Sequence, residues 1–349
     1  MNTENKSGSR IALPDILKGI AVVRMILVHL FEVFATPDIY NDKIWHWLVF
    51  IAGPPGAALF MVVMGYFIAR SSNDPANIIT RGFKLLLWGL LLNIGMNLHL
   101  LLKIASGAIS VNPWPYVFGV DILFLAGFSM ILLGVLKTVF RNRGFPFVVL
   151  ALLFASAGSF MPFCPGDLNF MKYMLAFFIG GQPWSYFPVF PWAAYPLAGF
   201  AFYWINEKYQ FSGFSGKGML YAASSLFVIL ALSFSWGFRT ASSPELYYNH
   251  SLLFFLWVLL LILFWIIVIH LTTMKYISAA AVRYLRWVGR YVTNFYVFQW
   301  LLIGNIGTAV YKTQNGMAIL IWFFAITVST SGLVYVYRMI KARGKAIRG

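Results

Sequence analysis

Ten long apolar runs, separated by short polar breaks, constrain this chain more than any other feature of its sequence. A helix of about 20 apolar residues is long enough to cross the hydrocarbon core of a bilayer. Because that core offers no partner for free backbone groups, such runs are expected to be helical. The expected spans are residues 14–36, 45–69, 83–102, 117–137, 145–162, 187–205, 218–238, 251–271, 287–306 and 316–338.

The composition agrees with this pattern, since 60% of the residues are hydrophobic and only 10% are charged. A soluble domain has about a quarter of its residues charged, so a water-soluble fold, a disordered chain and a disulfide scaffold are excluded. The single cysteine, Cys164, excludes an intramolecular disulfide and a cysteine-based metal cluster. We expect an all-α, polytopic integral membrane protein with about ten transmembrane helices.

One domain is expected over residues 1–349, with a helical bundle at 14–338 between a cytoplasmic tail at 1–13 and a basic cytoplasmic tail at 339–349. Segment 170–181 is apolar but too short to cross, so we expect it to be re-entrant or interfacial.

The basic residues indicate the orientation of the chain. Most of the 26 Lys and Arg residues lie in the tails and in every second loop. The opposite loops contain only Lys43, Lys103, Lys172, Arg239 and Lys312. This asymmetry places both termini in the cytoplasm and favours an even number of spans. The first apolar run carries charges that the core of a cleavable signal peptide would lack, so no cleaved signal is expected.

A polar stripe runs along the first expected span. Asp15, Lys18, His29 and Glu32 fall within about one third of the helix circumference at 100° per residue. Ionisable groups inside a bilayer are costly, so this stripe must face protein or water. Arg24 lies on the opposite face and needs a separate partner.

Two interpretations of this stripe remain open. Asp15 and Lys18 either form an interfacial pair that anchors the helix or belong to a functional site. His29 lies in the half of the span away from the cytoplasm, where an imidazole can abstract a proton near neutral pH or can simply bond a neighbour. Glu32, one turn away, is either a carboxylate that orients His29 or a solvated group at the outer interface.

Asp121 and His46 are the other candidates on the non-cytoplasmic side. Asp121 opens the fourth span, where a carboxylate is either functional or a helix cap. His46 lies near the start of the second span, beside Trp45 and Trp47, which are typical of an aromatic belt. The remaining histidines are expected to be interfacial or solvated: His99, His250 and His270. No two histidines have the i, i+4 spacing of a helical zinc site, so we expect no metal.

Two stretches rich in Gly or Pro are expected to break helices on the outer side. They are Gly53-Pro54-Pro55-Gly56 in the second span and FPVFPW at residues 187–192. Broken backbone at membrane depth is tolerated only where it lines a cavity or is buried in protein.

Basic side chains gather at the expected cytoplasmic helix ends: Arg70, Arg81, Lys84, Arg286 and Arg290. They either follow the positive-inside rule or bind the phosphates of a cofactor, which arginine can grip with two hydrogen bonds. The chain has no Walker-type loop and no GxGxxG motif, so ATP or NAD chemistry has no support.

Several of these motifs resemble those of membrane acyltransferases. The pattern LDxxRGxA…MxxxH is similar to DILKGIA at 15–21 followed by Met25 and His29, and the separation of Lys18 and His29 resembles that of Arg and His in the acyltransferase-3 family. The second-helix pattern G…LF…G(Y/F) resembles Gly56, Leu59, Phe60, Gly65 and Tyr66. Two further stretches resemble the heparan-alpha-glucosaminide N-acetyltransferase-like family: VDIL at 120–123 and FPVFPWAAYPLAG at 187–199. Both families have a late segment similar to GRYVT at 289–293.

The resemblance implies transfer of an acyl group, expected to be acetyl, from cytoplasmic acyl-CoA to a sugar or glycan across the membrane. His29 or His46 would be the general base, with Asp15, Lys18 and Asp121 in the catalytic group. The acyl-CoA would bind at Arg70, Arg81, Lys84 and Arg290, and the acceptor would contact Glu32, Trp192 and Tyr195. Lys18 replaces the usual arginine, and Gln299 stands where a second histidine often occurs.

Two other classes of function remain open. A proton-coupled secondary transporter also uses broken helices and intramembrane ionisable groups. A noncatalytic membrane partner in envelope assembly would need neither CoA nor proton flux. The expected partners are the lipid bilayer, acyl-CoA and the acceptor. The sequence is compatible with a homo-oligomer, and no nucleic acid partner is expected. The expected location is a bacterial inner membrane.

Overall fold

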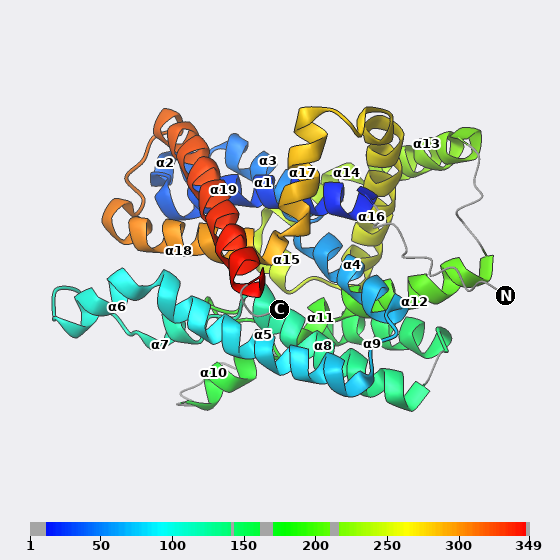
Figure 1. The fold of residues 1–349 in the computed structure, drawn as a ribbon, viewed down its shortest axis with the longest axis horizontal. Helices are drawn as coiled ribbons and strands as arrows, with labels where there is room; N and C mark the ends of the chain where they lie inside the picture. The colour runs from blue at the N-terminus through cyan, green and yellow to red at the C-terminus, as the bar shows by residue number, and fades with distance from the viewer. Residues whose placement is uncertain (1–11, 141–142, 161–169, 210–215, 347–349) are drawn as a thin grey trace.

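The computed structural model describes residues 12–140, 143–160, 170–209 and 216–346, and Figure 1 shows their arrangement. These residues form helices joined by short connections, with isolated β-bridges in place of strands, so the predicted all-α class is confirmed. The α-helices of the first half are α1 (Ala12–Phe34), α2 (Pro37–Tyr40), α3 (Lys43–Ala52), α4 (Ala57–Arg70), α5 (Pro75–Met96), α6 (Leu98–Ala105), α7 (Trp114–Val117), α8 (Ile122–Phe140), α9 (Phe145–Phe160) and α10 (Met171–Ala176). The second half contains α11 (Val189–Trp192), α12 (Ala194–Tyr209), α13 (Gly216–Leu232), α14 (Phe234–Ser242), α15 (Pro244–Tyr248), α16 (Leu252–Thr273), α17 (Ala280–Arg290), α18 (Val292–Val310) and α19 (Gly316–Ala346).

Every expected span falls on a helix or on two consecutive helices. Among the described residues, 5 spans are long and apolar enough to cross a membrane, or up to 6 if α13 and α14, bent by 70° at their junction, form one span. The chain is therefore an integral membrane protein, and the count of ten stays a prediction. Figure 1 shows α16 and α17 running steeply across the direction of α5 and α8.

The expected span at 218–238 crosses the bend between α13 and α14 at Ser233, so it is not one continuous helix. The boundaries of two further expected spans were wrong. The span at 83–102 crosses the junction of α5 and α6 at Asn97, and α5 already begins at Pro75. The span at 287–306 crosses the junction of α17 and α18 at Tyr291. Apolar composition continues through both junctions, so hydropathy alone does not reveal them.

The two Gly/Pro stretches break their helices as predicted. The second span is divided into α3, whose C-cap is Gly53, and α4, whose N-cap is Gly56. Phe190 has non-helical backbone angles (φ −100°, ψ 121°) inside α11, immediately before α12. The short α10 occupies the apolar segment 170–181, too short to cross, as expected.

Paired glycines allow the helix backbones to touch. A Cβ at Gly65 in α4 would overlap the carbonyl oxygen of Pro196 in α12, and a Cβ at Gly199 in α12 would overlap that of Val62 in α4. The same reciprocal arrangement joins Gly19 of α1 to α17. Small residues at such crossings are typical of helix packing in membranes, where close van der Waals contact replaces the hydrophobic effect.

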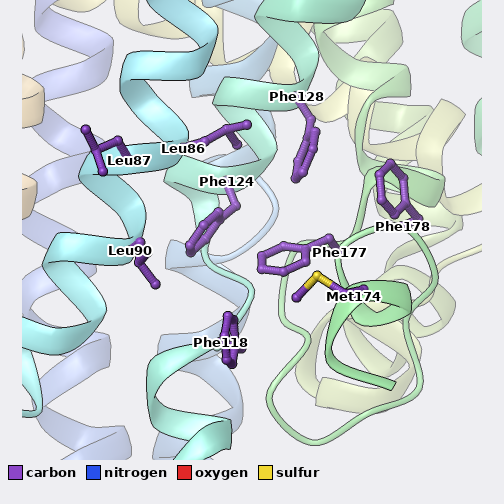
Figure 2. A pocket seen from close by; sticks show the side chains of 9 residues that line it. All are labelled: Leu86, Leu87, Leu90, Phe118, Phe124, Phe128, Met174, Phe177 and Phe178. Carbon is purple, nitrogen blue, oxygen red and sulfur yellow. The ribbon is translucent and has the colours of Figure 1, made fainter. Parts of the chain in front are cut away.

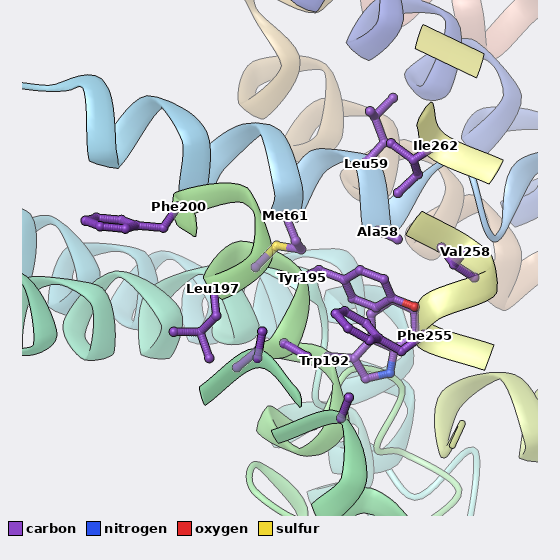
Figure 3. Packing of buried hydrophobic residues seen from close by; sticks show 14 of the residues in the cluster. Ala58, Leu59, Met61, Trp192, Tyr195, Leu197, Phe200, Phe255, Val258 and Ile262 are labelled. Atoms are coloured by element: carbon purple, nitrogen blue, oxygen red, sulfur yellow. The ribbon is translucent and has the colours of Figure 1, made fainter. Parts of the chain in front are cut away.

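The largest buried cluster surrounds the start of α12, where Figure 3 shows Trp192, Tyr195 and Phe255 packed together. The Tyr195 ring centroid lies 5.4 Å from that of Trp192 and 5.0 Å from that of Phe255. A second group of helices, formed by α17, α18 and α19, packs around α1, and α18 also contacts α5. The polar residues of α1 therefore lie where these two parts of the molecule meet.

Candidate active site

His29 stacks on an aromatic ring of α18, in the group of helices formed by α17, α18 and α19. Its ring centroid lies 4.1 Å from that of Trp300 in α18, with 31° between the planes. The side chain is half-buried, and its Nδ1 is buried with no hydrogen-bond partner among the described residues. An unsatisfied buried nitrogen is unusual, and a bound water or substrate is one explanation for it.

Asp121 lies beside the same face of α18. The Tyr296 hydroxyl, one turn before Trp300, donates to Asp121 Oδ2 at 3.2 Å. The backbone N–H groups of Leu123 and Phe124 donate to Asp121 Oδ1 at 2.9 and 3.3 Å, so this carboxylate also caps α8. Residues four apart share one helix face, so Asp121 and His29 contact the same face of α18, one turn apart.

Asn93 supports the backbone that leads to Asp121. It is fully buried in α5, and its Nδ2 donates to the carbonyl oxygens of Val117 and Gly119 at 3.0 and 2.8 Å. The sequence alone did not predict Asn93, Tyr296 or Trp300 as site residues. An amide inside an apolar run could have indicated Asn93, since such a group needs a partner in the membrane.

Glu32 is surrounded by tyrosines and one lysine. It interacts electrostatically with Lys312, whose Nζ lies 5.2 Å from the ring centroid of Tyr40. Burial, and then the Glu32 carboxylate, raise the pKa of the Tyr40 and Tyr186 phenols, so both stay protonated and can donate hydrogen bonds. No hydrogen bond joins Glu32 to His29 in the described part of the chain, so of the two open interpretations the structure does not support the one in which Glu32 orients His29.

The pair of Asp15 and Lys18 lies far from His29. Asp15 is buried, and its Oδ1 forms an ion pair with Lys18 Nζ at a distance of 2.9 Å. Asp15 precedes His29 by 14 residues, or roughly 21 Å of helix, so the two side chains do not meet. This ion pair fits the anchoring interpretation, and a role for it in a second part of the site stays a prediction.

Arg24 has the separate partner that its position requires. Its guanidinium donates to the carbonyl oxygen of Ile51 at 3.1 Å and lies 4.3 Å from the ring centroid of Trp265. It therefore binds the end of α3, next to the break before α4, which confirms the expectation.

His46 is half-buried in α3, beside Trp45. The Trp45 ring lies 6.0 Å from Phe31 and 4.4 Å from Tyr40, so this part of α3 packs against the Glu32 end of α1. His46 and His29 therefore both remain candidates for the base.

Trp192 and Tyr195 are not positioned to stack on a sugar. Their side chains are 0% and 1% exposed, Trp192 Nε1 donates to the carbonyl oxygen of Tyr248 at 2.9 Å, and the Tyr195 hydroxyl bonds His250 Nε2 at 3.1 Å. The prediction of sugar contact was wrong for these enclosed rings. His250 is 1% exposed, so its prediction as interfacial or solvated was also wrong.

The basic side chains predicted to bind acyl-CoA are all exposed near helix ends. Arg70 ends α4, Arg81 and Lys84 lie in the first turns of α5, and Arg290 ends α17. This placement fits both the positive-inside rule and phosphate binding, so their role stays a prediction.

A comparison with known families agrees with the motifs. The family model described as heparan-alpha-glucosaminide N-acetyltransferase, catalytic, matches residues 10–231, which is more than half of the chain. This match includes every candidate site residue up to Tyr195, whereas Arg290, Tyr296 and Trp300 lie beyond it. No curated protein and no solved structure gives a significant match, and the relation to the acyltransferase-3 family stays a prediction. The chain belongs to the heparan-alpha-glucosaminide N-acetyltransferase catalytic family of membrane acyltransferases.

Proposed function

We propose that this enzyme transfers an acetyl group from cytoplasmic acetyl-CoA to a sugar or glycan on the other side of the membrane. The family supports an acetyl donor and a glucosamine-type acceptor. The observation that carries the proposal is the half-buried His29 ring, which stacks on Trp300 and has one nitrogen unsatisfied, while Tyr296, one turn before Trp300, bonds Asp121.

In the proposed reaction, His29 takes a proton from an acceptor amine or hydroxyl while that group attacks the thioester carbonyl. The C–S bond then breaks, the acceptor receives the acetyl group and CoA leaves as the thiol after protonation. A positioned general base contributes about 10²–10⁴-fold to the rate. His46 is the alternative base, from the neighbouring helix α3.

The acceptor sugar would contact Glu32 and the protonated tyrosines near it. A carboxylate and phenols can accept and donate hydrogen bonds to the amine and hydroxyls of a sugar. The CoA phosphates would be held at the cytoplasmic side by Arg70, Arg81, Lys84 and Arg290. Asp15 and Lys18, on the cytoplasmic half of α1, would line the way from the donor to His29.

The proposal is tested by incubating membranes that contain the protein with radiolabelled acetyl-CoA. We expect label in a sugar-containing product and none in membranes that lack the protein. Labelled glycans that appear equally without the protein would overturn the proposal. A proton-coupled transporter would instead show proton flux with a solute and no labelled product.

A further inference from the structure

The turn between α18 and α19 carries a lysine in an unusual backbone conformation. Lys312 has φ 53°, and within the described ranges no other residue apart from glycine has a positive φ. Glycine and asparagine adopt this left-handed region at less cost than lysine does. Because either of those residues would suit the turn better, a lysine here indicates a role for its ammonium group.

Three backbone hydrogen bonds fix this turn against the outer end of α1. The Lys312 N–H donates to the carbonyl oxygen of Val33 at 3.1 Å, and the Gln314 N–H donates to that of Phe34 at 2.8 Å. The Thr36 N–H donates back to the carbonyl oxygen of Gln314 at 3.0 Å. Val33 directly follows Glu32, so the turn holds Lys312 beside that carboxylate.

Aromatic rings hold the ammonium group in place. Lys312 Nζ lies 5.2 Å from the ring centroid of Tyr40 and 5.5 Å from that of Tyr311. Tyr40 in turn packs on the buried Trp45, with 4.4 Å between the ring centroids. Contacts between a cation and aromatic rings orient the ammonium without using its hydrogen-bond donors.

Glu32 and Lys312 attract each other but do not pair. Both side chains are half-buried, and Lys312 acts electrostatically on Glu32. In the part of the chain that the structure describes, no ion pair joins them and neither side chain forms a hydrogen bond. The ammonium has three donors, and the carboxylate has about four acceptor positions. One group that reaches both side chains can therefore bond to each of them.

The chemistry of this pair selects a hydroxyl group as its ligand. A carboxylate or phosphate ion only accepts hydrogen bonds, so it suits Lys312 but is repelled by Glu32. A protonated amine only donates, so it suits Glu32 but is repelled by Lys312. A hydroxyl donates to a carboxylate and accepts from an ammonium at the same time.

The apolar groove between α5, α8 and the segment that contains α10 offers nothing comparable. Figure 2 shows that phenylalanine, leucine and methionine side chains line it. Such walls have no side-chain donor or acceptor for a hydroxyl. Binding of a polar sugar is therefore better supported at the outer end of α1 than in this groove.

The position of the pair relative to His29 suits a sugar ring. Glu32 follows His29 by three residues, or roughly 4.5 Å along the axis of α1. Residues three apart lie on neighbouring parts of one helix face. A sugar whose reacting amine or hydroxyl reaches His29 can therefore place another of its hydroxyls at the level of Glu32.

We propose that Glu32 and Lys312 bind one hydroxyl of the acceptor sugar between them and so position the sugar at His29. The hydroxyl donates to the Glu32 carboxylate and accepts from Lys312 Nζ. This inference rests on the proposed function and adds Lys312 as a specificity-determining residue of its acceptor site. A site built for a hydroxyl rejects an analogue that lacks it, because the polar groups of the site are then left unpaired.

The test measures acetyl transfer to glucosamine and to its 3-deoxy, 4-deoxy and 6-deoxy analogues in proteoliposomes supplied with acetyl-CoA. For the unmodified enzyme, the KM for one of these analogues should be about tenfold or more above that for glucosamine. Lys312→Asn should raise the KM for glucosamine to about the same value. It should show no further increase with that analogue, because both changes remove the same hydrogen bond.

Thermal unfolding separates this role from a structural one. Asparagine tolerates the left-handed conformation, so the Tm of Lys312→Asn should be unchanged or higher. A lysine that only stabilises the turn would instead give a lower Tm and leave the discrimination between the acceptors intact. Lys43→Asn is the matched control, because it removes an exposed lysine at the start of α3, and it should behave as the unmodified enzyme.

If Lys312→Asn does not fold, Glu32→Gln tests the other end of the same bridge and should also abolish the discrimination. Equal KM values for glucosamine and all three analogues, or discrimination that survives in the variant, would overturn the inference and leave water as the ligand of the pair. Failure of the proposed function is distinct, since no acceptor would then be acetylated. In that case, stabilisation of the protein by glucosamine, and its loss in Lys312→Asn, would still decide whether the pair binds a sugar.

Discussion

Asp121 accepts hydrogen bonds from two helices, and each helix uses a different carboxylate oxygen. Oδ1 accepts from the first backbone N–H groups of α8, and Oδ2 accepts from Tyr296 of α18. The sequence predicted that Asp121 is either a cap or a functional residue, and the structure confirms the cap. It also adds Tyr296, whose role no local pattern could indicate, because the contact joins residues far apart in the chain.

Substitution of Asp121 separates its two roles. Asp121→Ala should lower the free energy of unfolding by about 0.5–2 kcal/mol, the usual cost of losing a cap. Asp121→Asn keeps a side-chain oxygen for α8, so it should retain the stability and lower kcat if the carboxylate also acts in transfer. Thermal unfolding and acetyl transfer measure the two effects. An Asp121→Ala variant as stable as the unmodified protein would contradict the capping role.

Arg24 can be tested at the break between α3 and α4. Arg24→Met keeps much of the side-chain volume but removes the donor to the Ile51 carbonyl and the contact with Trp265. We expect a loss of about 1–3 kcal/mol in the free energy of unfolding, because a hydrogen bond from a charged donor and a cation–π contact are lost together. Arg239→Met, at an exposed position of α14, is the control and should change it by less than about 0.5 kcal/mol. Equal effects of the two substitutions would show that Arg24 does not support the break.

The close approach of α4 and α12 depends on glycines where the two helices cross. Gly65→Leu should prevent correct folding, because its side chain would overlap the Pro196 backbone rather than a movable side chain. Gly332→Leu is the matched change in α19, where a Cβ meets nothing within 4 Å, and it should fold with stability equal or higher by up to about 1 kcal/mol. Yield and size-exclusion profile in detergent provide the measurement. A well-folded Gly65→Leu protein would contradict the crossing of α4 and α12.

Helix breaks were predictable only where the residue type itself disfavours a helix. Gly53 to Gly56 and the prolines at 188 and 191 indicate their breaks directly. The junctions at Asn97 and Tyr291 have neither a proline nor a Gly/Pro cluster, and the single glycines near them, Gly95 and Gly289, do not by themselves predict a break inside an apolar run. For the same reason, the burial of Trp192 and Tyr195 could not be distinguished by sequence from an exposed aromatic patch, since both environments favour aromatic residues.

The orientation of the whole molecule remains a prediction from its basic residues, and it can be tested directly. Cys164, which lies outside the described residues, is the single cysteine of the sequence, so Cys164→Ser provides a background without cysteine. In that background, a membrane-impermeant maleimide applied to intact cells should label Ser106→Cys and should not label Arg283→Cys. Both positions are exposed. The opposite labelling pattern would reverse the assignment of the donor and acceptor sides.

Donor binding is a second property of the whole molecule. Acetyl-CoA at about 100 times its dissociation constant should stabilise the purified protein by about 2.7 kcal/mol, since it binds the folded state alone. Substitution of Arg81 and Lys84 by Gln should weaken this stabilisation if both contact phosphate. The same stabilisation by acetate and pantetheine at equal concentrations would argue against phosphate recognition.

The proposed reaction depends most directly on His29. We predict that purified His29→Gln protein keeps its stabilisation by acetyl-CoA but transfers acetyl groups to glucosamine about 10²–10⁴-fold more slowly, whereas His46→Gln retains most of the rate. The reverse result would move the base to His46. Full transfer activity in both variants would contradict histidine general-base catalysis by this enzyme.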